Sequence, residues 1–141
     1  MAAALGYRPD ASAARLCFHL QQPSYTTDTL IAVLEQLAFF YAGQRVVLIW
    51  DGRSSHWSTK MRAFLDSQRD WLRAERLPAY APELNPVEGL WANLKDVELA
   101  NRPTTTLAEV ADATEHGIQR VCKHQDLVVG FLAHTGLSLD P

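Results

Sequence analysis

The chain has 141 residues, of which 48% are apolar and 21% are charged, and its formal net charge at pH 7 is −3. These values suit a soluble globular protein of about one domain, and no apolar run approaches the ~18 residues that a membrane span requires. A slightly acidic balance argues against a protein that coats nucleic acid over its whole surface.

The N-terminal third predicts a β-hairpin followed by a helix. Residues 2–7 and 14–20 have the composition of two strands, and Pro9 and Asp10 between them supply the chemistry of a tight turn. A helix is predicted over residues 26–42, because apolar side chains recur there at helical spacing between a threonine cap and a glycine.

The middle of the chain predicts two strands separated by a helix. Residues 45–50 end in the apolar run V-V-L-I-W, which is typical of a fully buried parallel strand. Ser55 can cap the helix that follows. The apolar stripe of that helix consists of Trp57, Met61, Phe64 and Leu65. Charged residues interleave residues 72–77, which predicts a strand at the edge of the sheet.

Three helices are predicted in the remainder of the chain. Asn85 caps the first, and Pro86 follows at its first helical position. Thr106 and Glu109 form a capping box for the second, and a short apolar helix over residues 126–134 closes the chain. The order of these elements predicts one α/β domain over the whole chain, with residues 104–141 as a helical extension.

The charges are unevenly distributed along the sequence. Seven of the thirteen Lys and Arg residues lie within residues 44–77, together with four acids, whereas residues 96–141 hold seven acids and three bases. A basic middle segment can meet a phosphate backbone while the rest of the surface repels it. A solvated helix face explains the same pattern, and both interpretations stay open.

Two acidic residues stand where an α/β sheet places its chemistry. Asp51 follows the apolar strand directly, and Glu88 lies 37 positions later, where a loop leads into a helix. Because parallel strands end at the same edge, we expect the two carboxylates to share a divalent-metal site. Each acid alone has another explanation, a turn-forming aspartate before Gly52 and a capping-box glutamate paired with Asn85. Only the pair favours a metal site.

Four basic side chains are candidates for contacts with phosphate. His56 follows the strand-end aspartate by five residues, and Lys95 follows Glu88 by seven, which returns it to the same helix face. Arg53 and Lys60 belong to the basic middle segment. An exposed position on a loop or helix is the alternative explanation for each of them.

Two longer segments carry a specific resemblance. V-V-L-I-W-D-G-R-S-S-H-W-S and L-P-A-Y-A-P-E-L-N-P-V-E-G-L-W-A-N-L-K, in this order and spacing, resemble the second and third acidic motifs of DDE transposases in the mariner-related insertion-sequence family. The resemblance covers most of the chain. It implies an RNase H-like mixed sheet with flanking helices, two-metal catalysis with Mg²⁺ or Mn²⁺, and DNA transposition. Asp51 and Glu88 would be the second and third members of the catalytic triad.

The resemblance also implies a first catalytic aspartate on an opening strand, which in family members precedes the position of Met1. We therefore expect a C-terminal part of a catalytic domain that cleaves DNA little or not at all by itself. The expected partners are transposon ends and target DNA, and a second copy or the product of an upstream reading frame is a candidate protein partner.

Cys17 and Cys122 lack the spacing of a metal or disulfide motif, which suits the reducing cytoplasm. We expect the protein there, in association with the nucleoid.

Two alternatives stay open. One is another enzyme of the same fold, such as a resolvase or an RNase H-type nuclease. The other is a non-catalytic remnant that binds DNA or dimerises.

Overall fold

The structure is a computed structural model that describes residues 1–10, 12–21, 24–100 and 106–139. The chain forms two compact units, each with its own hydrophobic core. Met1–Leu20 with Glu83–Pro141 is called the hairpin unit, and Gln21–Pro82 the parallel-strand unit. One residue of the predicted N-terminal turn, Ala11, and residues 104–105 and 140–141 of the predicted extension lie outside the described residues.

The hairpin unit begins with the predicted pair of antiparallel strands. β1 (Ala2–Tyr7) pairs with β2 (Ala14–His19), and Leu5 lies opposite Leu16 in the register. Alternate side chains of both strands face the core of this unit, as the period of two in a half-covered sheet requires. The residues of the two strands that face the core are Ala3, Leu5, Tyr7, Ala14, Leu16 and Phe18.

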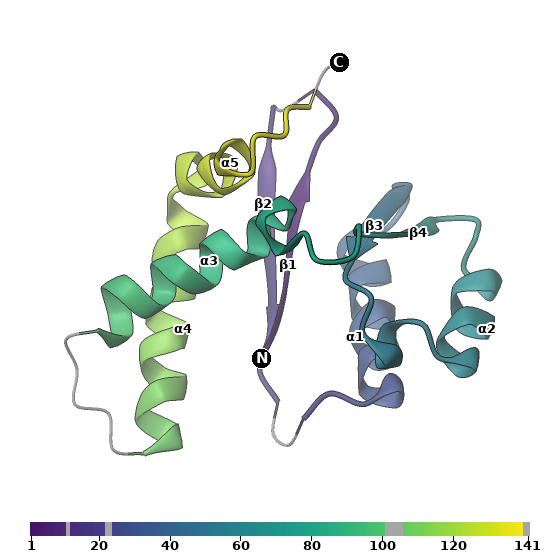
Figure 1. Ribbon diagram of the computed structural model, residues 1–141, viewed down its shortest axis with the longest axis horizontal. Coiled ribbons are helices and arrows are strands. Elements are labelled where there is room, and N and C mark those ends of the chain that lie inside the picture. Colours follow the sequence, from purple (N-terminus) through teal and green to yellow (C-terminus); the bar gives the residue numbers. More distant parts are fainter. Residues whose placement is uncertain (11, 22–23, 101–105, 140–141) are drawn as a thin grey trace. The chain divides into compact units, whose positions relative to one another are not determined.

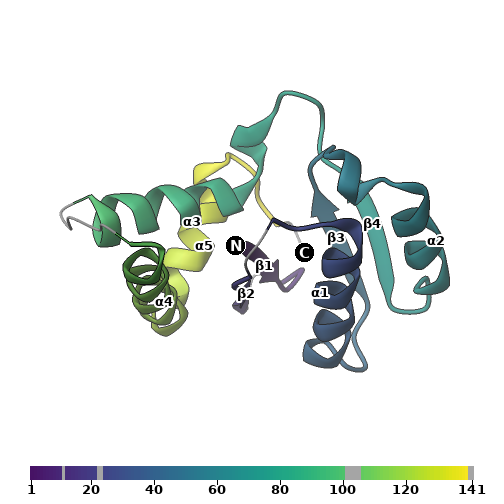
Figure 2. The ribbon, with the colours of Figure 1, turned by 90° about the horizontal axis from the view of Figure 1, so that it is seen from below.

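Three helices complete this unit at the predicted places. α3 (Pro86–Leu94) is capped by the Asn85 side chain, and α4 (Leu107–Lys123) begins at the capping box of Thr106 and Glu109. α5 (Gln125–His134) follows directly. Figures 1 and 2 both show the three helices on one side of the hairpin, where Leu90, Val121, Val128 and other apolar side chains are buried.

A π-helical segment, η3 (Lys95–Leu99), extends α3 and is tied to α4. Arg120 on α4 donates to Glu98 Oε1 at 2.8 Å and to Asn93 Oδ1 at 2.6 Å. Gly117 allows this approach, because a Cβ at that position would lie 2.6 Å from Glu98 Cγ. These contacts fix the C-terminal end of the helix that carries Glu88.

The parallel-strand unit contains the remaining helices and strands. It consists of α1 (Thr27–Phe40), β3 (Val46–Trp50), the 3₁₀ turn η1 (Ser54–His56), α2 (Thr59–Ser67) and β4 (Leu72–Arg76). A further 3₁₀ turn, η2 (Pro82–Leu84), lies just before α3. β3 and β4 run parallel, with Val46 opposite Leu72 and Trp50 opposite Arg76. The sequence leaves Thr26 and Thr27 open as the threonine cap of α1, and the structure shows that the cap is Thr26.

β3 differs from the predicted fully buried strand. Val46, Leu48 and Trp50 pack towards α1 and α2, but Val47 and Ile49 are 60% and 59% exposed. The prediction of burial on both faces is therefore wrong for this strand. The reason is that the helices of the parallel-strand unit cover one face of the β3–β4 pair, so the period of two leaves alternate residues outside.

Ser55 does not cap α2, contrary to the prediction. It lies inside η1, and the cap is Ser58, whose side chain accepts the backbone N–H of Met61 at 3.2 Å. The helix consequently starts at Thr59, and Trp57 precedes it rather than lying on its apolar stripe. The α-helix starts later than predicted because Ser54–His56 adopt the tighter 3₁₀ conformation.

The α/β class predicted from the order of elements is confirmed. Within the described ranges, the four strands form one antiparallel and one parallel pair, and helices cover a face of each. A search of the described helices finds none whose length and apolarity would allow it to cross a membrane.

Candidate metal centre

Asp51 stands at the C-terminal end of β3, where the sequence predicts it. The backbone N–H of Leu77 donates to the carbonyl of Trp50 at 2.9 Å, so the pairing of the two parallel strands continues to the residue before Asp51. The Asp51 side chain is 42% exposed. Its carboxylate is thus fixed at a strand end and still accessible to a ligand.

The loop after β3 holds this carboxylate. Nδ1 of His56 lies 2.7 Å from Oδ1, and the backbone N–H of Arg53 donates to the same oxygen at 3.0 Å. Nε of Arg53 lies 3.2 Å from Oδ2. Because an ionised carboxylate only accepts hydrogen bonds, Nδ1 of His56 carries the hydrogen in this contact. The bond from Arg53 is an Asx turn, so Asp51 also has the turn-forming role that was its alternative explanation.

His56 is part of the site rather than a surface residue. Its imidazole stacks on the Trp50 indole with a centroid separation of 4.3 Å and an interplanar angle of 4°. Only 15% of its side chain is exposed. Trp57 donates its indole N–H to the Asp51 backbone carbonyl at 2.8 Å. Two aromatic residues and one imidazole therefore define the loop that carries Asp51.

Arg76 is a neighbour of this loop that sequence reasoning missed. A Cβ placed on Gly52 would lie 2.7 Å from Nε and 2.9 Å from Cζ of Arg76, so the guanidinium lies directly over the glycine. The parallel register explains this position, because Arg76 is the partner of Trp50. The sequence contains a signal for this contact, because Arg76 lies at the end of the strand that is predicted next to the one that ends at Asp51.

Glu88 is the third residue of α3 and is exposed. The Asn85 side chain accepts the N–H of Val87 at 3.2 Å, and the N–H of Glu88 donates to the Asn85 carbonyl at 3.0 Å. Among the described residues, the Glu88 carboxylate makes no hydrogen bond or ion pair. The capping-box contact between the Glu88 side chain and the Asn85 backbone is therefore not formed, and the Glu88 carboxylate is accessible to a ligand.

The other basic candidates differ in their surroundings. Lys60 pairs with Asp28, and both side chains are exposed. Lys95 is exposed at the end of α3, two turns after Glu88 and on nearly the same face. The basic segment expected around the metal site is thus represented near Asp51 by Arg53 and Arg76, while Lys60 forms an exposed ion pair with Asp28.

The shared metal site stays a prediction. Asp51 belongs to the parallel-strand unit and Glu88 to the hairpin unit. In the part of the chain that the structure describes, no three His, Cys, Asp or Glu side chains gather into a group that could hold a metal ion. Each of the two carboxylates nevertheless offers the accessible oxygen atoms that Mg²⁺ and Mn²⁺ prefer, and Arg53 is the cation that a metal would replace at Asp51.

A strand-end acid on an α/β scaffold of this kind is consistent with the RNase H-like class of domain. The chain matches a protein-family model described as DDE superfamily endonuclease over residues 11–111, and it belongs to this family. No curated protein matches the chain. Membership supports a function of the nuclease or transposase type that acts on DNA, and nucleases of this superfamily typically use divalent metals.

Proposed function

We propose that the chain is part of the catalytic domain of a mariner-related insertion-sequence transposase, which cleaves and joins DNA strands with divalent metals. Family membership and the two acidic motifs in their order support this proposal. The observation that carries it is the position of Asp51, at the end of β3 with an accessible carboxylate.

Asp51 and Glu88 would hold Mg²⁺ or Mn²⁺. Two such ions would activate a water or a 3′-hydroxyl for attack and would stabilise the leaving oxygen. The residues around Asp51 suit this task differently. His56 is largely buried and keeps the carboxylate oriented, whereas Arg53 is 79% exposed and its ion pair can be exchanged at little cost. Arg53 can then contact a DNA phosphate, and so can Lys60 and Lys95.

Chemistry of this kind normally uses more than two carboxylates, and the resemblance implies a third. We expect the chain alone to hold the ions weakly and to cleave DNA little or not at all. Mg²⁺-dependent nicking of a terminal inverted repeat by the purified chain would contradict this expectation. A second copy or the product of an upstream reading frame is the proposed protein partner, and restored cleavage after co-expression would support it. The proposed location is the cytoplasm, at the nucleoid.

Metal binding tests the two acids directly. Titration with Mn²⁺, followed by electron paramagnetic resonance, should show binding that Asp51→Asn and Glu88→Gln each weaken by roughly tenfold or more. Glu115→Gln is the matched control, because it neutralises an exposed acid on α4. Glu88→Gln should leave stability intact, because Asn85 provides the side-chain cap. Unchanged Mn²⁺ affinity in both Asp51→Asn and Glu88→Gln would contradict the proposal.

The double variant tests whether the two acids share the ions. If they do, Asp51→Asn combined with Glu88→Gln should weaken Mn²⁺ binding by less than the product of the two single effects, because either loss already disrupts the same site. Strictly additive effects on the binding free energy would indicate separate sites.

The second candidate is a non-catalytic remnant that binds DNA. It is favoured by the exposed side chains of Arg53, Arg69 and Arg73, which can contact phosphates without a metal. For such a protein, Asp51→Asn and Glu88→Gln would leave DNA retention unchanged, with or without Mg²⁺. Another RNase H-like nuclease, such as a resolvase, would prefer a junction or an RNA–DNA hybrid over the terminal repeat in the cleavage assay.

A further inference from the structure

The parallel-strand unit contains an open cavity of about 500 Å³ between α2 and β4. It lies outside the Asp51 carboxylate site, and none of its lining residues was a candidate from the motifs. The lining residues are Trp57, Arg62, Leu65, Asp66, Arg69, Leu72, Arg73 and Ala74.

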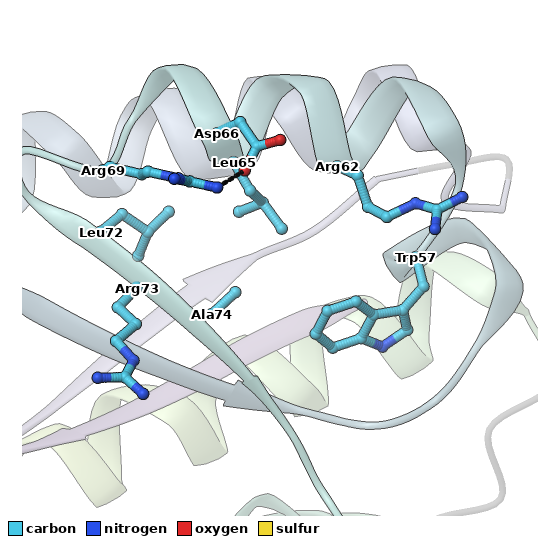
Figure 3. A pocket seen from close by; sticks show the side chains of 8 residues that line it. All are labelled: Trp57, Arg62, Leu65, Asp66, Arg69, Leu72, Arg73 and Ala74. Atoms are coloured by element: carbon cyan, nitrogen blue, oxygen red, sulfur yellow. Dashed lines mark hydrogen bonds and ion pairs between the residues drawn. The ribbon is translucent and has the colours of Figure 1, made fainter.

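The cavity combines an apolar floor with a cationic rim. Figure 3 shows Leu65, Leu72 and Ala74 in the middle, with Trp57 at one end. Three arginines and one aspartate line it, so the lining carries a formal charge of +2, although the whole chain carries −3. The fold therefore places part of the basic middle segment around one hollow.

The arginines are available to an anion. Arg69 pairs with Asp66 at 2.5 Å and Arg73 with Glu75 at 2.6 Å, but the two guanidinium side chains are 77% and 78% exposed. Exposed pairs of this kind contribute little and exchange readily for a phosphate. Among the described residues, the Arg62 side chain has neither a hydrogen bond nor an ion pair.

The cavity is physically linked to the candidate metal site. Trp57, which forms its end wall, donates its indole N–H to the backbone carbonyl of Asp51 at 2.8 Å. Trp57 also directly follows His56, which contacts the Asp51 carboxylate. A ligand in the cavity would therefore touch the loop that positions the acid.

We propose that this cavity is a nucleotide subsite for a single DNA strand. One base lies on the apolar floor against Trp57, and the flanking phosphates bind Arg62 and Arg69. An apolar planar group next to anionic groups is the chemistry that a cationic rim around an apolar hollow recognises. The inference rests on the proposed function, in which DNA is the substrate, and assigns a place on the chain to one of its nucleotides.

The phosphate contacts are tested by fluorescence anisotropy with a labelled single-stranded oligonucleotide in the presence of EDTA, so that metal binding does not contribute. Arg62→Ala and Arg69→Ala should each weaken binding about threefold or more and lower the salt slope by about 0.7. Arg45→Ala is the matched control, because Arg45 is exposed just before β3, outside the cavity, and its loss changes the net charge equally. The control should bind like the unaltered protein.

The base contact is tested by an oligonucleotide series with single abasic sites. At one position, loss of the base should weaken binding about fivefold or more. Ala74→Phe fills the floor of the cavity, so this variant should bind abasic and intact strands equally. If Ala74→Phe does not fold, as judged by circular dichroism, the abasic comparison on the unaltered protein decides the question alone.

The outcomes separate this inference from the proposed function. Equal binding by the arginine variants and the control, or no effect of any abasic site, would overturn the nucleotide subsite and leave the metal-binding proposal intact. Competition by a polyglutamate peptide, without an abasic effect, would identify an acidic peptide as the occupant and also overturn it. Absence of any DNA binding would overturn both the subsite and the DNA-binding part of the proposed function. The Mn²⁺ titration would still test whether Asp51 and Glu88 bind metal.

Discussion

At the scale of single residues, Asp51 depends on a histidine that the motif only hinted at. His56 lies five positions after Asp51, and its sequence position was compatible with either a site residue or a surface residue. The structure brings Nδ1 within 2.7 Å of the carboxylate because the 3₁₀ turn η1 reverses the chain and the imidazole stacks on Trp50. We interpret His56 as a positioning residue for the candidate metal ligand.

His56→Phe should weaken Mn²⁺ binding about tenfold, because it keeps the stacking on Trp50 but removes the hydrogen bond to Asp51. His56→Asn should recover much of the affinity, because an amide nitrogen can replace Nδ1 as the donor. Mn²⁺ titration of both variants measures the effect. If the two variants lose affinity equally, His56 supports the loop by packing and not by orienting the carboxylate.

Tyr7 provides a residue-scale test of the hairpin core. Its hydroxyl donates to the Val128 carbonyl at 2.9 Å, and burial raises the pKa of Tyr7 to about 12 from the ordinary value of 10.0. The folded protein therefore keeps this proton at a pH where the unfolded chain loses it. The contribution of Tyr7 to stability should be complete below pH 10 and disappear as the pH rises from 10 to 12.

The comparison with Tyr7→Phe isolates this effect from the other groups that titrate at high pH. The difference in unfolding free energy between the two proteins, measured in urea, should be constant below pH 10 and then shift in favour of the variant. A difference that stays constant through pH 12 would show that Tyr7 is not held in its neutral form by the fold.

At the scale of elements, the helix caps were largely predictable. Thr26, Asn85 and the pair of Thr106 and Glu109 cap their helices as expected, because a cap is a contact between residues two or three positions apart. The start of α2 was mispredicted because several serines follow the β3 loop, and local preference does not choose among them. The apolar content of β3 likewise indicated a strand but not how many of its faces are covered.

Ser58→Ala should destabilise the protein by about 1 kcal/mol, because the Met61 N–H loses its side-chain acceptor. Ser55→Ala is the matched control and should cost much less, because no helix cap depends on its side chain. Urea unfolding at neutral pH measures both. A larger loss for Ser55→Ala would mean that α2 starts earlier than the structure has it.

At the scale of the whole molecule, the two cores raise the question of domain organisation. Met61 is fully buried in the parallel-strand unit and Leu90 in the hairpin unit, and the chain crosses between the units twice. The prediction of one domain over all 141 residues is not tested by this division, because compact units can still unfold together.

Met61→Ala and Leu90→Ala separate these possibilities. Each should destabilise its core by about 2–5 kcal/mol through the loss of buried apolar volume. One domain predicts that both substitutions shift a single unfolding transition seen by calorimetry and by circular dichroism. Two transitions, each shifted by only one of the substitutions, would show that the units are separate domains.

The sequence by itself determined where the helices lie along the chain, the caps of α1, α3 and α4, the strand that ends at Asp51 and the two acidic motifs, because these depend on local spacing and on the order of residues along the chain. Only the tertiary structure decided that Arg76 lies over Gly52, that His56 supports Asp51, and that Arg62 and Arg69 lie beside one hollow. The physical reason is that parallel pairing, helix packing and the path of a loop bring side chains together in ways that no periodicity in the sequence encodes.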